Sequence, residues 1–81
     1  MIASIEFLGM QRVMTKTKSI DMTITEKTRV NDALEYVRQK YPKLRLDEET
    51  LLITVNQKVA SLDRVLKDND VVSFLPFISG G

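Results

Sequence analysis

One helical stripe constrains the fold of this 81-residue chain more than any other feature. Apolar side chains recur with the period of a single helix face at Val30, Leu34, Val37 and Tyr41. Thr28 is a candidate N-cap for this helix, and Pro42 disfavours helical geometry at Tyr41. Because no second stripe of this length is present, the helix has to cover its apolar face on a sheet.

Strands are predicted on both sides of the helix in sequence. Alternation of side chains typical of half-buried strands is found in residues 2–8, 19–24, 51–55 and 71–75. After a turn at Asn56 and Gln57, residues 58–60 are expected to return briefly beside the third strand. Pro76 cannot donate to a sheet ladder, so the last strand is expected to end there.

The remaining segments are expected to be loops and turns. Residues 9–18 are predicted as a hairpin loop in which Gly9 takes a positive φ. Residues 61–66 are predicted as one short helical turn whose apolar side chains, Leu62, Val65 and Leu66, plug the core. Asn69 suits a left-handed position in the turn that follows.

This order of elements predicts an α+β fold of the β-grasp type. A leading hairpin, a crossover helix and later strands give a mixed sheet with one main helix packed on one face. A ferredoxin-like fold is the plainest alternative, but it needs two good helices. We therefore expect a β-grasp domain over residues 1–75 and a flexible, extended tail over residues 76–81.

Composition excludes several kinds of chemistry. The chain has no cysteine and no histidine, which excludes disulfides, thiolate catalysis and Cys-type zinc sites and removes the usual general base. We expect no metal site and no bound cofactor. Twelve basic and 11 acidic residues give a net charge of +1, so neither a nucleic-acid nor a membrane partner is indicated. A cytoplasmic protein whose chemistry is done largely by a partner is expected.

The carboxyl terminus is the candidate reactive site. Two of the three glycines of the chain are Gly80 and Gly81. An extended glycine pair can thread a channel that any Cβ would block, and its tip is the ionised α-carboxylate of Gly81. A carboxylate acylates poorly, so it needs activation, most simply adenylation by an ATP-using partner. The alternative is that Phe77 and Ile78 fold back on the core and that the two terminal glycines form a flexible end without a function.

Four motifs resemble the ubiquitin-like β-grasp sulfur carriers, and most closely the small subunits of molybdopterin synthases. They are "VNQ" at 55–57, "SLD" at 61–63, "KDND" at 67–70 and the terminal pattern P-x-x-S-G-G at 76–81. The resemblance implies that a ubiquitin-activating-like adenylyltransferase activates Gly81, that the chain then carries sulfur there as a thiocarboxylate, and that it donates this sulfur for the dithiolene of molybdopterin. The larger subunit of the synthase is the implied second partner, in a heterotetramer that contains two copies of that subunit.

The resemblance also implies how the chain meets its partners. Ser79 and Gly80 would thread the partner's channel, while an apolar patch would dock both partners. The patch is expected to comprise Phe7, Val59, Leu75, Pro76, Phe77 and Ile78. Two positions depart from the family pattern, because Leu75 replaces an aromatic residue and Phe77 replaces a second proline. Phe7, at the end of its strand, suits the core as well as it suits this patch.

Three other functions remain open from the sequence. The chain could be a ubiquitin-like modifier joined to lysines through Gly81, or a sulfur carrier for thiamine or another metabolite. It could also be a non-covalent binding module in which the glycines have no role. In each of these, as in a synthase subunit, the chain supplies no catalytic side chain of its own.

Overall fold

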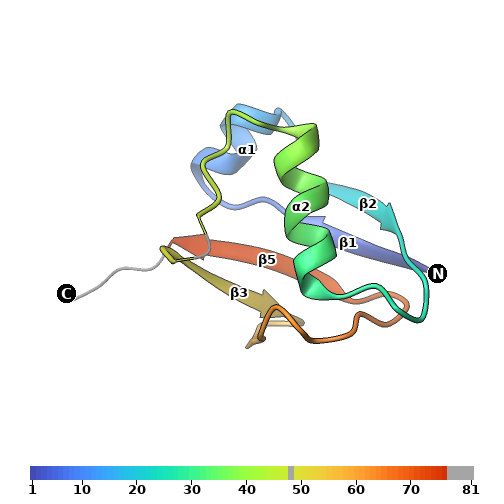
Figure 1. Cartoon of the computed structure of the whole chain (residues 1–81). Helices are drawn as coiled ribbons and strands as arrows, with labels where there is room; N and C mark the ends of the chain where they lie inside the picture. The colour runs from blue at the N-terminus through green and yellow to red at the C-terminus, as the bar shows by residue number, and fades with distance from the viewer. Residues whose placement is uncertain (48, 77–81) are drawn as a thin grey trace.

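The computed structural model describes residues 1–47 and 49–76, and it is a five-stranded sheet with one main helix across a single face (Figure 1). The elements in chain order are β1 (Ile2–Glu6), α1 (Met10–Thr15), β2 (Ser19–Thr23), α2 (Val30–Lys40), β3 (Leu51–Val55), β4 (Lys58–Val59) and β5 (Val71–Pro76). The strand order is β2-β1-β5-β3-β4, with β1 and β5 parallel and the other neighbours antiparallel. This arrangement confirms the predicted β-grasp fold and its mixed sheet.

The N-cap of helix α2 lies one residue later than predicted. Arg29 occupies the N-cap position in extended geometry, and the Asp32 carboxylate accepts a 2.8 Å hydrogen bond from the Arg29 backbone amide. The Thr28 hydroxyl instead accepts from the amide of Thr25 at 2.9 Å, so it orders the preceding turn. At the other end, Tyr41 donates its amide to Val37 and Pro42 follows, as the sequence predicts.

The core lies between α2 and the sheet face beneath it. Strands β1, β3 and β5 turn alternate side chains toward the helix, and α2 meets them with the predicted apolar stripe. The buried apolar residues of these elements, with Phe7 just after β1, are Ala3, Ile5, Phe7, Val30, Ala33, Leu34, Val37, Ile53, Val55, Val72 and Phe74. The helix therefore covers one face of the sheet and leaves the other face without a covering element among the described residues.

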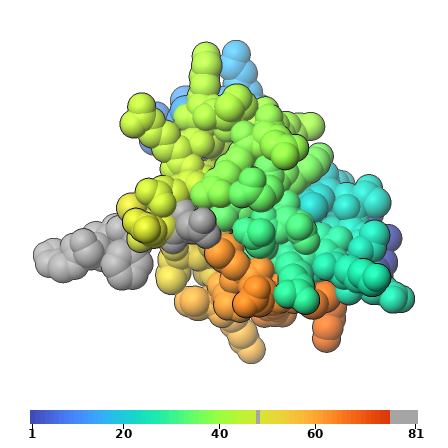
Figure 2. All heavy atoms as spheres, viewed as in Figure 1, coloured from blue at the N-terminus to red at the C-terminus, as the bar shows by residue number. Residues whose placement is uncertain are grey.

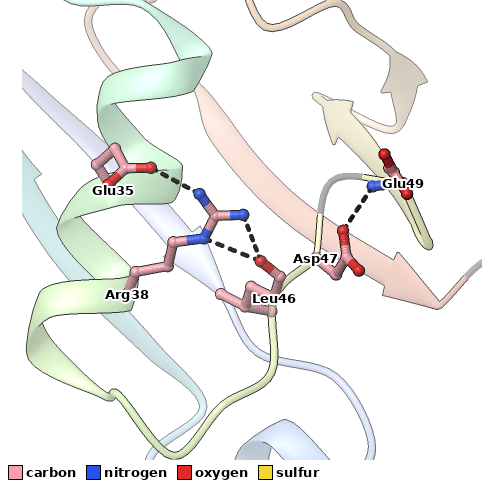
Figure 3. A network of polar contacts seen from close by, with 5 residues as sticks. All are labelled: Glu35, Arg38, Leu46, Asp47 and Glu49. Carbon is pink, nitrogen blue, oxygen red and sulfur yellow. Dashed lines mark hydrogen bonds and ion pairs between the residues drawn. The ribbon is translucent and has the colours of Figure 1, made fainter.

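The loop after α2 closes one end of this core. Leu44 and Leu46 are each only 6% exposed, and Arg38 on α2 fixes the loop by donating to the Leu46 carbonyl through Nε at 2.9 Å and Nη2 at 2.6 Å (Figure 3). The same guanidinium pairs with Glu35 at 2.6 Å. A buried carbonyl gains more from a charged donor than from a neutral one, so Arg38 holds the loop firmly.

Two predicted loops differ from the structure. Residues 9–18 contain the short helix α1, which the sequence pattern did not predict. Residues 61–66 form a turn and an isolated bridge between Arg29 and Val65 instead of a helical turn. Val65 is 40% exposed, so only Leu66, and in part Leu62, plug the core as expected.

The turn residues behave as their chemistry predicts. Gly9 has φ 55°, Asn69 has φ 70°, and Asn56 and Gln57 have φ 52° and 69°. Two successive left-handed residues make the tight turn that joins β3 to β4, because their twist matches that of a hairpin. None of the helices in the described part of the chain is long and apolar enough to cross a membrane.

Candidate functional site

Strand β5 carries the chain through the middle of the sheet to its carboxyl-terminal end. It pairs with β1 on one side and with β3 on the other, and its last pair joins Pro76 to Leu51. Near this end, the Gln11 side chain donates from Nε2 to the Phe74 carbonyl at 2.8 Å. The strand that precedes the tail is therefore fixed on both sides. The predicted site residues Phe77, Ile78, Ser79, Gly80 and Gly81 lie outside the described residues.

A polar clamp fixes the start of β5. Asn56 donates from Nδ2 to Asp70 at 2.9 Å, and its own Oδ1 accepts from the Val71 amide at 2.9 Å. The second carboxylate oxygen of Asp70 accepts from the Lys67 amide at 2.8 Å, and Asp70 is only 6% exposed. The "VNQ" and "KDND" motifs that mark the resemblance thus meet in space, where they position the strand that leads to the tail.

We expect Asp70→Ala to lower the free energy of unfolding by about 1–3 kcal/mol, because it removes a buried carboxylate that accepts hydrogen bonds from Asn56 and Lys67. Chemical denaturation measures this loss. Asp63→Ala is the matched control, since the Asp63 side chain is 91% exposed and pairs with Arg29 only at 3.8 Å. That control should change the stability by less than about 0.5 kcal/mol. Equal effects of the two substitutions would contradict the clamp.

The uncovered sheet face holds the candidate docking residues. Leu75 is half-buried there and stands directly opposite Leu52 of β3. Val59 of β4 pairs with Thr54 on the same face and is 67% exposed. These three apolar residues, Leu52, Leu75 and Val59, form what we call the open-face patch, which follows β5 toward the tail. Pro76 is the last residue of β5, and its backbone continues the same strand.

Leu52 was missed in the sequence analysis. The alternation of residues 51–55 points Leu51, Ile53 and Val55 toward the core, and it therefore places Leu52 on the opposite face with Thr54. That signal alone does not connect Leu52 to the docking residues. The connection needs the antiparallel register of β3 and β5, which only the structure gives.

Phe7 is placed in the core, which corrects its assignment to the docking patch. Its side chain is fully buried and packs edge to face against Tyr41, with 5.5 Å between the ring centroids and 87° between the planes. The reason is the strand parity, because Phe7 follows Ala3 and Ile5 on the helix-facing side while the open-face patch has the opposite parity. A partner on the uncovered face does not reach this ring.

No side-chain chemistry competes with the carboxyl terminus among the described residues. Within residues 1–47 and 49–76, no group of three or more acidic side chains is close enough to hold a metal ion. A hollow of about 340 Å³ lies on the uncovered face beside the Asn56–Gln57 turn, lined also by Glu6, Val71 and Ser73. It is an open surface feature, and among the described residues no hydrogen bond joins the Ser73 hydroxyl to the Glu6 carboxylate in it.

Comparison with known proteins decides the family. The family model described as "ThiS family" matches residues 5–81, which is nearly the whole chain and includes the terminal glycines. The chain belongs to the ThiS family. The chain is also 32% identical over 75 residues to the molybdopterin synthase sulfur carrier subunit of Mycobacterium tuberculosis, covering 93% of this chain and 90% of that protein. The resemblance to the sulfur carrier subunits of molybdopterin synthases is thereby confirmed.

Solved structures confirm the ubiquitin-like β-grasp architecture of this ThiS family chain. A candidate subunit 1 of the molybdopterin converting factor from Pyrococcus furiosus superposes with a TM-score of 0.81 at 25% identity, over 95% of this chain and 98% of that one. Small archaeal modifier protein 1 from Methanosarcina acetivorans gives 0.78 at 24%, over 99% and 96%. Subunits 1 and 2 of the molybdopterin-converting factor of Helicobacter pylori were solved as a complex, which gives 0.66 at 24% and full coverage of both chains.

Proposed function

We propose that this ThiS family chain is the sulfur carrier subunit of a molybdopterin synthase. The observation that carries the proposal is the identity of 32% with the sulfur carrier subunit of Mycobacterium tuberculosis, in a match that spans nearly all of both proteins. The family match reaches the terminal Gly80–Gly81 pair. The absence of histidine and cysteine agrees with a chain that bears its cargo on its end and leaves catalysis to partners.

The chemistry resides on the α-carboxylate of Gly81. A ubiquitin-activating-like adenylyltransferase joins this carboxylate to AMP from ATP and releases pyrophosphate. A sulfide equivalent from a sulfur-donor protein then displaces AMP, which leaves a thiocarboxylate. Transfer of that sulfur to the molybdopterin precursor returns the carboxylate through hydrolysis. The chain contributes a slim, extended terminus, since glycine presents no Cβ to the walls of a channel.

The large subunit of the synthase is the proposed receiving partner. The structurally similar Helicobacter pylori protein was solved in complex with its second subunit, which supports such a pairing here. We assign the open-face patch to this contact, because its Leu75 lies on the strand that delivers the tail. Two copies of each subunit would form a heterotetramer in which each carrier serves one large subunit.

The decisive test is the intact mass of the protein isolated from its own cells, with fragmentation of its carboxyl-terminal peptide. We expect a species in which one oxygen of Gly81 is replaced by sulfur. If only the free acid is found, the measurement is repeated after incubation with ATP, the activating enzyme and a sulfur donor. Failure to form the thiocarboxylate under those conditions would overturn the proposal.

A protein modifier is the second candidate. Its support is the similarity in fold to small archaeal modifier protein 1 and the shared need for an activated glycine. Conjugation would transfer the Gly81 acyl group to a lysine amine and release AMP or a thiol. A ladder of higher-mass conjugates in cell extracts, lost when Gly81 is removed, would favour this candidate over the carrier or show that both functions coexist.

We expect Leu75→Ser to weaken binding to the large subunit at least about tenfold, because burial of one leucine side chain contributes about 1.5–3 kcal/mol. Leu52→Ser should have an effect of the same size, since the two residues stand opposite each other. Val65→Ser is the matched control, as Val65 is exposed but lies outside the open-face patch. Calorimetric titration of each variant measures the affinities. If the two patch variants bind the large subunit as tightly as the Val65→Ser control does, the patch is not part of the interface.

A further inference from the structure

Helix α1 exposes its apolar side chains to solvent and buries a polar one. Its apolar residues are exposed, with 69% of Met10, 65% of Val13 and 47% of Met14 accessible to solvent. Its one buried residue is the polar Thr15. A surface helix ordinarily has the reverse arrangement, with its apolar side toward the core. The three exposed residues follow each other at helical spacing, so they form a continuous apolar surface on one side of α1.

Polar contacts hold the inner side of this helix. Gln11 donates from Nε2 to the Phe74 carbonyl, and Arg12 donates from Nε to the Phe7 carbonyl, each at 2.8 Å. The Thr15 hydroxyl donates to the Gln11 carbonyl at 2.8 Å. Fold stability therefore does not require the apolar residues of the outer side. Their exposure is a cost in water that a folded partner would remove.

A hollow adjoins this surface where α1 meets the end of α2. Met14 lines a depression of about 210 Å³ together with Tyr41, Pro42 and Leu44, and the side chains of Lys40 and Lys43 complete it. Figure 1 shows α1 beside the carboxyl-terminal end of α2. In Figure 2 this end of the molecule projects at the top of the view. We call Met10, Val13, Met14 and this hollow the α1 surface.

The two segments that build the α1 surface carry charges of one sign. Residues 7–20 and 36–46, which build this end of the molecule, contain seven of the 12 basic residues, while all 11 acidic residues lie elsewhere. Arg38 is paired with Glu35 outside these segments. Lys40 and Lys43, by contrast, are exposed and border the apolar hollow directly. An apolar surface with a basic border is complementary to an apolar side chain flanked by carboxylates.

We propose that the α1 surface is a second docking site, and that it binds an acidic segment of a partner protein that inserts an apolar side chain into the hollow. A second copy of the same surface fits poorly, because the basic borders would face each other. The site adjoins the end of α2, whereas the open-face patch lies on the side of the sheet opposite to α2 (Figure 1). A carrier held through its sheet face can therefore engage a second protein through α1. This proposal does not depend on the identity of the cargo on Gly81.

The test is a nuclear magnetic resonance titration of the full-length ¹⁵N-labelled chain. Two helical peptides that differ only in charge are added, one with leucines flanked by glutamates and one with lysines replacing those glutamates. We expect the acidic peptide alone to shift amide resonances of residues 8–17 and 40–44. Met14→Ser should weaken its binding about tenfold, and Lys40→Glu combined with Lys43→Glu should weaken it by a similar factor.

Matched variants separate the site from general effects. Val65→Ser removes an exposed apolar side chain elsewhere, and Lys27→Glu reverses a distant exposed charge, so both should bind the acidic peptide as the unaltered chain does. Equal binding of the basic peptide, shifts centred on the open-face patch, or no shift at millimolar peptide would overturn the proposal. Binding to phosphatidylglycerol vesicles in preference to the peptide, or self-association through α1, would also overturn it.

Discussion

Replacement of the Gly81 carboxylate by a carboxamide is expected to abolish sulfur transfer while leaving the fold unchanged. The amide nitrogen cannot be adenylated as a carboxylate is, so neither the acyl adenylate nor the thiocarboxylate can form. The described contacts that hold β5 end at its pairing of Pro76 with Leu51, so none of them involves the altered group. The expected activity is therefore no greater than that of the assay without carrier.

Two semisynthetic proteins are compared, one with a carboxylate and one with a carboxamide at Gly81. They are otherwise the same chain. Synthase turnover and the mass of the carboxyl-terminal peptide are measured for both after incubation with ATP and the activating enzyme. Equal chemical denaturation midpoints would show that the fold is intact. Sulfur transfer by the amide would contradict the proposed chemistry and favour a function in which the terminus takes no part.

The main helix and the strands could be predicted because each has a periodic pattern that burial enforces. The stripe from Val30 to Tyr41 and the alternation from Ile2 to Phe7 both follow the side of the element that faces the core. The turns at Asn56 and at Asn69 were predictable for a different reason, since asparagine tolerates left-handed geometry. Local rules thus determine the elements and limit their order to few topologies.

The remaining features depend on contacts between distant segments. Helix α1 has its apolar residues on the solvent side and is held by hydrogen bonds to Phe7 and Phe74, so no amphipathic rule finds its orientation. The pairing of Leu52 with Leu75 requires the register of two strands that lie about twenty residues apart in sequence. Phe7 has an apolar side chain that suits a core and an interface equally, and its burial against Tyr41 decides between them.

The placement of Phe7 gives the last prediction, which separates a core residue from a docking residue. We expect Phe7→Ala to lower the free energy of unfolding by about 3–5 kcal/mol, because it leaves a cavity beside Tyr41. Small domains have a net stability of only about 5–15 kcal/mol, so this variant should be partly unfolded at modest denaturant concentration. Denaturation followed by circular dichroism measures the loss.

Phe7→Leu supplies the matched variant, since it keeps most of the apolar volume and should cost less stability than Phe7→Ala. If Phe7 acts only in the core, Phe7→Leu binds the large subunit with unchanged affinity, whereas Leu75→Ser loses about tenfold. The opposite pattern, with Phe7→Leu weakening binding and Phe7→Ala leaving stability intact, would return Phe7 to the interface. Stability and affinity therefore respond to different faces of the same sheet, and these two variants distinguish them.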